Sequence, residues 1–529
     1  MSRHYDVVII GSGVGGSTLA QRLAPTGKSI LILERGEHLP READNWNPKA
    51  VFIDNKYRAA ERWFDKAGKP FHPNTHYYAG GNTTFYGAAL MRLREGDFRE
   101  VRHKGGISPA WPIDYADLKP YYAEAETLWK VHGERGVDPA EAPGDPPYAY
   151  PPIRHDPGIE QLKLHFEGQG WKPFNLPLGV DFEAGKPLTS PCIKCKTCGG
   201  YPCLLKAKSD ARTRALEPAL DYPNVTLMTG RKAIRLETDP SGRTVTAVVT
   251  QGAEGEERWS GDIVVAAAGA VNTAALFLAS ANAAHPDGLA NGSDQVGRNY
   301  AFHTLTAVVS LTLAPLDAPF PKTLAVNDFY WRDPRGGFEF PMGHIQLLEY
   351  MSGQTLEGQV ADYLPPFLAP GFAFEAVAER LLSFLVISED LADPDNRVKL
   401  GPDGRIILEY THNNLEGHER LVATLRAALD GFVSHHHPIS QHRLEFASLL
   451  PLYGTAHQAG TVRFGADARS SVLDRWCKAH DLDNLYVTDS GFFVSSAAVN
   501  PTLTIVANAM RVGDHLKERL GARDAAATA

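Results

Sequence analysis

The segment "YDVVIIGSGVGGSTLAQRLAPTGKSILILERG" (residues 5–36) decides the fold class of this 529-residue chain. Val7–Ile10 form an unbroken apolar run, as a strand buried on both faces requires. A glycine-rich turn follows, then a helical stretch at Ser17–Leu23 that ends at Gly27, then a second apolar strand at Ser29–Leu33. The order strand, turn, helix, strand predicts an α/β fold with buried parallel strands.

Three glycines of the turn, Gly11, Gly13 and Gly16, have the spacing G-x-G-x-x-G. In this motif the first glycine permits a tight turn, the second lets a pyrophosphate approach the backbone, and the third lets helix and strand pack closely. Glu34 ends the second strand, where a carboxylate can accept hydrogen bonds from ribose hydroxyls. The four residues predict a dinucleotide site, but the motif alone does not separate FAD from NAD.

The remainder of the chain alternates between this pattern and a different one. A helix over 207–220, strands over 225–228 and 233–251, and a strand followed by a helix over 262–280 repeat the α/β pattern, as does 484–516. Residues 303–450 are richer in strand-like stretches. We predict a Rossmann-like nucleotide-binding domain assembled from 1–104, 191–302 and 455–529, with 105–190 and 303–454 forming a β-sheet-based substrate domain and cap.

Composition narrows the classes of partner. Hydrophobic content of 43% and charged content of 22% are typical of a globular protein with a sizeable core, and the net charge of −9 argues against nucleic acid as a ligand. No apolar run reaches the length of a membrane span, and the first strand begins too early for a signal peptide. We expect a cytoplasmic protein, periplasmic only if it is exported together with a partner subunit.

Four further segments carry a family resemblance. They are "GGNTTFYGAALMR" (80–92), "VVAAAGAVNTAALFLAS" (264–280), "GSDQVGRNYAFH" (292–303), and a C-terminal block that begins "AHQAGT" (456–461) and continues through "NLYVTDSGFFVSSAAVNPTLTIVANAMRVGDHL" (484–516). In content and order they resemble the glucose–methanol–choline (GMC) oxidoreductases, especially bacterial FAD-dependent sugar dehydrogenase subunits, pyranose oxidases and glycoside 3-oxidases. The resemblance implies FAD and an architecture like that of p-hydroxybenzoate hydroxylase.

The resemblance also implies a catalytic pair. His457 in "HQAGT" matches the family's catalytic histidine, and Asn500 in "VNPT" matches the second member of its His–His or His–Asn pair. A neutral imidazole near physiological pH suits removal of a hydroxyl proton while hydride leaves the carbon for flavin N5. Locally, Asn500 also reads as the N-cap of a helix with Pro501 in its first turn, so a capping role and a chemical role are both open.

Cofactor contacts follow from the same match. The implied residues, beyond the glycine-rich turn and Glu34, are Gly80, Gly81, Asn82, Thr83, Ala233, Ala268, Asp489, Pro501 and Thr502. Some relatives attach flavin covalently to a histidine just after the paired glycines, but residues 80–86 contain no histidine or cysteine. We therefore expect FAD to be bound non-covalently. His303, at the end of a segment that approaches the flavin in the family, is a candidate for a pocket role.

Four cysteines are clustered in "SPCIKCKTCGGYPC" (190–203): Cys192, Cys195, Cys198 and Cys203. Their C-x2-C-x2-C-x4-C spacing is similar to a ferredoxin array in its first three steps, and it is also compatible with structural zinc or with plain thiols. An iron–sulfur cluster or zinc site is the prediction. A run of three histidines at 435–437 resembles a metal tract, although such runs are more often solvated.

The residues and the resemblance together predict oxidation of a hydroxyl of a sugar, glycoside or polyol to a carbonyl by hydride transfer to FAD. Alternatives are a non-redox flavin lyase of the hydroxynitrile lyase type and an oxidase of a non-sugar primary alcohol. A small subunit and a cytochrome or quinone acceptor are the expected partners if a cluster passes single electrons. Polar residues of the strand region 340–350 are candidates for contact with sugar hydroxyls.

Overall fold

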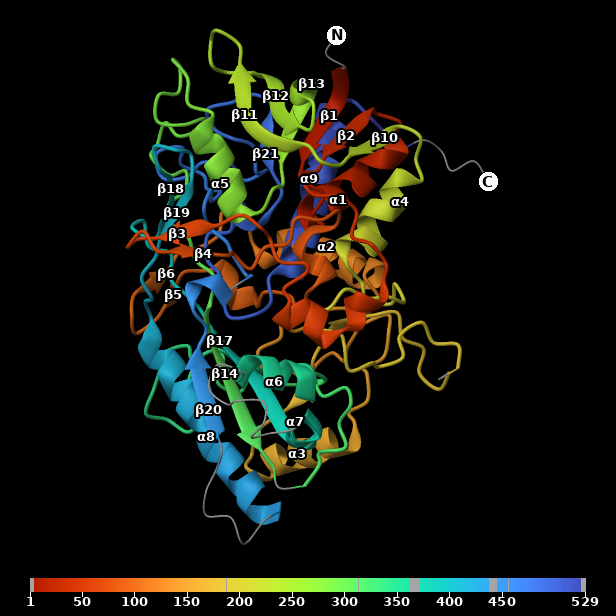
Figure 1. Ribbon diagram of the computed structural model, residues 1–529. Coiled ribbons are helices and arrows are strands. Elements are labelled where there is room, and N and C mark those ends of the chain that lie inside the picture. The colour runs from red at the N-terminus through yellow and green to blue at the C-terminus, as the bar shows by residue number, and fades with distance from the viewer. Residues whose placement is uncertain are drawn as a thin grey trace.

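The computed structural model describes residues 4–186, 188–312, 314–360, 371–436, 445–454 and 456–524. Two lobes are visible in Figure 1, each built around its own β-sheet, and the chain passes between them more than once. The predicted α/β class is confirmed, because one sheet has a parallel centre covered by helices and the other is antiparallel. None of the described helices is long and apolar enough to cross a membrane.

Segments from three parts of the chain form the first sheet. Its seven strands are β1 (His4–Ile10), β2 (Ile30–Leu33), β10 (Val225–Met228), β11 (Lys232–Thr238), β12 (Val245–Gly252), β13 (Gly255–Ala266) and β21 (Leu485–Val487). The order is β10-β2-β1-β13-β12-β11, with β21 paired to β13. Strands β10, β2, β1, β13 and β21 are parallel, while β11, β12 and β13 form an antiparallel meander. The predicted assembly from N-terminal, central and C-terminal pieces is therefore observed.

Helices α1 (Val14–Leu23), α5 (Ala270–Ala279) and α9 (Thr502–Arg519) accompany this sheet, and α2 (Tyr115–Leu128) packs against α9. The α1–α9 contact includes an ion pair between Arg22 and Asp514 at 2.7 Å, and Tyr122 of α2 lies 2.8 Å from the Thr504 hydroxyl. The stretch 105–190 is thus shared between the two lobes, since its first helix packs here. The domain boundaries themselves stay a prediction.

The second sheet is antiparallel throughout. Its strands, in the order β20-β14-β17-β16-β15-β8, are β8 (Phe174–Asn175), β14 (Thr304–Leu311), β15 (Leu324–Val326), β16 (His344–Leu347), β17 (Leu381–Ser388) and β20 (Glu445–Leu449). Helices α3 (Pro157–Gly168) and α8 (Leu415–His436) pack on one face, and Phe166 and Phe432 join Phe384 in the buried core there. Because side chains alternate along a strand, His344 and Gln346 of β16 point to the opposite face.

Smaller elements complete the fold. They are β3 (Trp63–Asp65), β4 (Pro70–Phe71), β18 (Arg397–Leu400) and β19 (Ile406–Glu409) in a four-stranded sheet; the pairs β5 (Val101–Arg102) with β6 (Ile107–Ser108) and β7 (Val131–His132) with β9 (Leu178–Gly179); and the helices α4 (Glu217–Leu220), α6 (Gly353–Val360) and α7 (Gly371–Ala378). The helix predicted over 207–220 is shorter than expected. It begins with a π-helical turn at Arg212–Leu216, beside which the Asp210 carboxylate accepts from the Thr213 backbone N–H at 2.8 Å.

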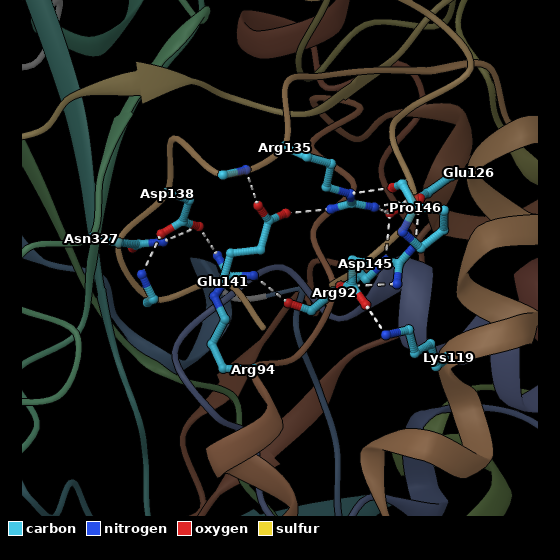
Figure 2. A network of polar contacts seen from close by, with 12 residues as sticks. Arg92, Arg94, Lys119, Glu126, Arg135, Asp138, Glu141, Asp145, Pro146 and Asn327 are labelled. Atoms are coloured by element: carbon cyan, nitrogen blue, oxygen red, sulfur yellow. Dashed lines mark hydrogen bonds and ion pairs between the residues drawn. The ribbon is translucent and has the colours of Figure 1, made fainter. Parts of the chain in front are cut away.

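A buried network of charged side chains ties α2 to the loops around it (Figure 2). Arg92 donates through two nitrogens to Glu126, at 2.7 and 2.6 Å, and Arg135 donates to the same carboxylate. Arg94 pairs with Asp138 at 2.6 Å, and both are almost fully buried. Buried charges are tolerated only when opposite charges pair with them. The network therefore fixes the loops that carry Arg92, Arg94, Arg135 and Asp138 relative to α2.

Candidate functional site

A cavity of about 1100 Å³ is lined by residues of both sheets. It extends from the glycine-rich turn and Glu34, past the loop at 80–83, to His457, Asn500 and the polar face of β16. Its volume is at the upper end of ordinary small-molecule sites, enough for a large cofactor and a substrate. The following predicted residues line it: Gly11, Gly13, Glu34, Gly81, Asn82, Thr83, Ala233, Ala268, Asp489, Pro501 and Thr502, together with the predicted catalytic pair.

The glycine-rich turn leaves no room for side chains at its close contacts. A Cβ on Gly11, whose φ is +102°, would lie 2.4 Å from the Ala267 carbonyl oxygen, and one on Gly16 would lie 2.1 Å from the Gly11 carbonyl oxygen. Gly16 does not line the cavity; its role is the close packing of α1 on β1. Gly13 precedes α1 and has open space where a Cβ would stand. The amide end of α1 therefore faces the cavity, as an anion site needs.

Glu34 is held rigidly at the cavity edge. It is buried, and its carboxylate accepts from the Ser12 backbone N–H at 3.0 Å, the Ser12 hydroxyl at 2.7 Å and the Gly36 N–H at 2.8 Å. A carboxylate has more acceptor positions than these three donors fill. Glu34 can therefore still accept from hydroxyl groups of a ligand in the cavity.

The loop at 80–83 crosses directly over the glycine-rich turn. Gly80 and Gly81 have φ of +100° and +61°, and a Cβ on Gly81 would stand 3.1 Å from Gly13 Cα. Thr83 donates to the Gly80 carbonyl and accepts from the Ala211 N–H, while the Asn82 side-chain oxygen accepts from the His76 N–H. Gly80 itself does not line the cavity and instead shapes the turn that brings its neighbours there.

Asp489 organises the turn at the start of α5. Its carboxylate accepts from the Thr273 hydroxyl at 2.5 Å, the Gly269 N–H at 3.0 Å and the Gly491 N–H at 2.8 Å. Burial raises the pKa of Asp489 to about 6, while the hydrogen bonds oppose that shift. Ala268 also lines the cavity, and its side chain is small.

His457 is in contact with a second histidine. Its Nδ1 lies 3.0 Å from His303 Nδ1, and His303 Nε2 lies 2.8 Å from the Ser496 carbonyl oxygen. Burial lowers the pKa of His303 to about 4; burial first and His303 second lower the pKa of His457 to about 3. Both rings are therefore neutral near pH 7.

The two contacts fix which nitrogen of each ring carries hydrogen. A carbonyl oxygen only accepts, so His303 Nε2 must donate to Ser496, which leaves His303 Nδ1 with a lone pair. His457 Nδ1 then donates to that lone pair. His457 Nε2 is left without a hydrogen, and as part of a cavity-lining residue it is the nitrogen available as a base.

Asn500 is not the N-cap that local sequence reasoning allowed. Helix α9 begins at Thr502 with Pro501 in the cap position, and no side chain caps it. The Asn500 side chain lines the cavity with 8% of its surface exposed, and its Oδ1 has no partner among the described residues. A buried amide oxygen without a partner is costly to the fold, so the residue is not placed here by hydrogen bonds of its own oxygen.

The wall opposite α9 belongs to the second sheet. Gln346, Leu385, Glu349 and Lys322 line the cavity there. Lys322 donates to the Gly87 carbonyl at 2.6 Å and lies 3.6 Å from Glu349. The polar residues that we expected in the region 340–350 are thus on the cavity side. Lys322 was missed, because nothing in its surrounding sequence marks it.

The predicted iron–sulfur or zinc site is not supported. Among the residues that the structure describes, no three His, Cys, Asp or Glu side chains are grouped as metal ligands, and Cys192, Cys195, Cys198 and Cys203 are free thiols. Cys198 Sγ accepts from the Lys322 ammonium at 2.9 Å, and that positive charge would repel a metal cation at the same sulfur. The side chains of the histidine run at 435–437 lie outside the described residues.

Two features were hidden from sequence reasoning. Gly15 is as constrained as the motif glycines, since a Cβ there would lie 2.0 Å from the Thr488 carbonyl oxygen. Lys208 is fully buried and donates to the carbonyls of Thr84, Cys198 and Tyr201, which fixes the cysteine loop. The doubled glycine in "GVGG" was a signal for Gly15, whereas a lysine satisfied by three carbonyls has no sequence signature.

Family models match three stretches of the chain. Models described as GMC oxidoreductase match residues 178–305 and 408–509, and a model described as NAD(P)-binding Rossmann-like domain matches residues 9–70.

Several characterised proteins are similar over almost the whole chain. Paromamine 6'-oxidase of Streptomyces fradiae is 32% identical over 96% of this chain and 90% of its own length. 6'''-Hydroxyparomomycin C oxidase of Streptomyces lividus is 30% identical over 99% and 93%, and the fructose dehydrogenase large subunit of Gluconobacter japonicus is 24% identical over 96% and 97%. Among solved structures, pyridoxine 4-oxidase from "Mesorbium loti" superimposes with a TM-score of 0.67 at 18% identity, over 97% of this chain and 99% of that one.

Proposed function

The chain belongs to the GMC oxidoreductase family, and from that premise we propose that it oxidises a hydroxyl of a sugar, glycoside or polyol with His457 as the base and Asn500 as the group that orients the alcohol. The family assignment makes it an FAD-dependent oxidoreductase of CH–OH groups. The sugar class is supported by the printed activities of the relatives on aminoglycosides and fructose.

The cavity fits FAD at its nucleotide end. The amide end of α1, the absence of a side chain at Gly13 and the Glu34 carboxylate suit a pyrophosphate and a ribose. Gly81, Asn82 and Thr83 would follow the pyrophosphate, and Pro501 and Thr502 begin the helix whose positive end suits an anionic reduced ring. When bound, FAD supplies a hydride acceptor.

His457 would take the proton of the substrate hydroxyl at Nε2. The contact with His303 supplies the correct tautomer, and burial keeps the ring neutral, so the lone pair is available without prior deprotonation. A positive charge that develops on His457 would be shared with His303 through their common hydrogen bond. The single observation that carries the proposal is this directed chain from the Ser496 carbonyl to the base nitrogen.

Asn500 would hold the same hydroxyl. Its amide lines the cavity and has a donor end and an acceptor end, and an alcohol has one O–H and two lone pairs to offer. Amide and imidazole together can therefore fix the hydroxyl so that the carbon's hydrogen faces the flavin. Alignment of this kind supplies a large part of the rate enhancement in many enzymes.

Non-covalent attachment of FAD is part of the proposal. No histidine or cysteine is present at 80–86, and His76, which lines the cavity, has its ring stacked on Phe85 with centroids 3.8 Å apart and its Nδ1 engaged 3.0 Å from the Tyr57 carbonyl oxygen. Acid precipitation should release yellow FAD into the supernatant. Flavin that stays with the pellet would contradict this part.

The electron acceptor is a separate question. The fructose dehydrogenase relative is by name one subunit of an assembly, which supports a partner protein or a quinone as acceptor, while the two aminoglycoside relatives are named oxidases. Oxygen uptake measured beside reduction of a quinone analogue and a cytochrome would assign it.

The test of the function is anaerobic bleaching of the flavin. A panel should contain free sugars, glycosides, polyols, aminated sugars, and non-sugar primary alcohols such as pyridoxine. Bleaching by a sugar, glycoside or polyol with formation of its carbonyl product is the expected result. Bleaching by the non-sugar primary alcohols alone would favour those alcohols as the substrate class. Bleaching by no member of the panel would overturn the proposal.

A further inference from the structure

A chain of buried polar side chains connects the Arg94–Asp138 ion pair to the cavity wall. Figure 2 shows the first three residues of this chain, Arg94, Asp138 and Asn327. The Asn327 side-chain nitrogen donates to Asp138 at 2.8 Å, and Asn327 Oδ1 lies 2.7 Å from His344 Nδ1. His344 Nε2 in turn lies 3.0 Å from the terminal amide of Gln346, which lines the cavity.

The ion pair sets the direction of every hydrogen bond in this chain. The Asp138 carboxylate, paired with Arg94 at 2.6 Å, can only accept, so Asn327 must turn its NH2 group toward it. The Asn327 oxygen is then the acceptor for His344, whose Nδ1 carries the hydrogen. Burial lowers the pKa of His344 to about 3, so the ring holds one hydrogen and not two.

The last link follows by the same logic. His344 Nε2 has a lone pair and needs a donor, whereas the atom placed at this contact is Gln346 Oε1, so the hydrogen bonds require the Gln346 amide to be turned with its NH2 group toward His344. The two ends of an amide have the same shape, and the surrounding hydrogen bonds decide which end is nitrogen. Because the nitrogen is committed to His344, the oxygen of Gln346 turns to the cavity, where no described residue bonds to it.

We propose that Gln346 forms a substrate subsite with its amide oxygen, which binds a hydrogen-bond donor of the substrate other than the hydroxyl that is oxidised. The donor is a second hydroxyl of a sugar or polyol, or the ammonium group of an aminated sugar, and an acceptor-only group at this position is rejected. This subsite rests on the proposed function, because it selects among substrates of the same cavity.

His344, Asn327 and the Arg94–Asp138 pair are positioning residues in this scheme. They never touch the substrate, yet they hold the Gln346 amide in one of its two orientations. A glutamine without such a partner, on a solvated wall of the cavity, would present either its oxygen or its NH2 group to a substrate. It would then discriminate little between donor and acceptor groups of the substrate. Because the Asp138 carboxylate of the buried ion pair can only accept, it fixes the orientation of each hydrogen bond from Asn327 to Gln346.

The experiment compares the holoenzyme with Gln346→Met and Gln346→Glu, after FAD content and melting temperature show that each variant is folded. The probe is a sugar that bleaches the wild-type flavin, together with its deoxyfluoro analogues, in which each non-reacting hydroxyl in turn is replaced by fluorine, a group that cannot donate. The wild type should lose roughly tenfold or more in kcat/KM for the analogue altered at one position. Gln346→Met should be insensitive to that same replacement, because its side chain has a similar length and no amide.

Gln346→Glu tests the orientation. A carboxylate still presents an oxygen to the cavity, so this variant should keep the wild-type preference for the hydroxyl over fluorine at that position. If the NH2 end of Gln346 faces the cavity, the wild type should tolerate fluorine, a weak acceptor, at that position and only Gln346→Glu should prefer the hydroxyl, and the proposal is overturned. An aminated sugar tested in parallel shows whether the donor is an ammonium group, since its advantage should then disappear in Gln346→Met.

Two further outcomes are decisive. Equal responses of wild type and Gln346→Met to every analogue, with normal bleaching by the parent sugar, would remove the subsite and leave the proposed function standing. Absence of bleaching by any sugar, glycoside or polyol in the wild type would overturn the function and the subsite together.

Discussion

His303 Nδ1 lies 3.0 Å from His457 Nδ1, and the pair is anchored by the Ser496 carbonyl on its far side. The hydrogen of His457 is thereby held on Nδ1, and its lone pair on Nε2. Two neutral imidazoles in this arrangement form a base whose reactive nitrogen is chosen by a backbone carbonyl and not by solvent.

Removal of His303 should impair the base without removing it. His303→Ala should slow reduction of the flavin by roughly tenfold or more, since His457 loses the acceptor that fixes its tautomer. The acid limb of the rate should also move to higher pH, because His303 helps to lower the pKa of His457. His303→Asn is the matched variant: its Oδ1 can accept at the same position, and asparagine tolerates the φ of +77° found there. Stopped-flow reduction of the flavin in the wild type and both variants, from about pH 3 to 9, measures the rate and the position of the acid limb. Identical profiles for His303→Ala and wild type would contradict the relay.

Buried neutral histidines also predict how stability depends on pH. The pKa values of His303, His344 and His457 are lowered by burial to about 4, 3 and 3 in the folded protein, against 6.5 in the unfolded chain. Below about pH 6.5 the unfolded state therefore binds more protons, and stability is lost as pH falls from 6.5 toward 4, by about 1.4 kcal/mol per pH unit for each such group. Melting temperatures from pH 7 to 5 should fall more gently in His303→Asn than in the wild type. Parallel curves would mean that His303 is charged in the folded protein.

Asn500→Ala should separate chemistry from stability. The residue does not cap α9, and its oxygen has no partner, so the melting temperature should stay the same or rise slightly. Reduction of the flavin by substrate should nevertheless slow by roughly tenfold or more, because the alcohol loses one of the two groups that orient it. A drop in melting temperature with an unchanged reduction rate would return Asn500 to a structural role.

The charged network of Figure 2 predicts that loss of one of its cations strongly lowers the free energy of unfolding. Arg92→Met should destabilise the protein by about 3–5 kcal/mol, because it leaves part of a buried carboxylate cluster without its cation. Arg99→Met is the control, since the Arg99–Glu95 pair is exposed and should contribute nothing measurable. Urea unfolding followed by fluorescence compares them. Equal midpoints for both variants would show that the network is not a stabilising unit.

Local patterns predicted what local forces determine. The strands and the glycine turn at 7–33 match the structure because apolar runs and glycine spacing are read from neighbouring residues, even though the carbonyl that excludes a side chain at Gly11 belongs to Ala267. Strand β10 was predicted with its observed limits for the same reason. The helix at 207–220 was placed too early because the sequence does not reveal that Lys208 is used to bind the carbonyls of Thr84, Cys198 and Tyr201.

The site depended on contacts between distant segments, and there the sequence was less informative. Asn500 looked like an N-cap because asparagine before proline usually is one, whereas in the fold it faces a cavity. The cysteine spacing suggested a metal because the sequence hides that Lys322, more than a hundred residues later, places an ammonium group on Cys198. The contact between residues 303 and 457 also joins two segments far apart in the chain, which a β-bridge between Ala301 and Ala459 brings together.

The most direct test of the central claim is anaerobic reduction of the flavin in His457→Ala. With a sugar that bleaches the wild type, the variant should keep its FAD and its melting temperature but lose about two or more decades of reduction rate, the scale expected when a general base is removed. His480→Ala is the control, because that histidine bonds Ser471 outside the cavity and should leave the rate unchanged. A reduction rate in His457→Ala within a few-fold of the wild type would contradict the assignment of His457 as the base.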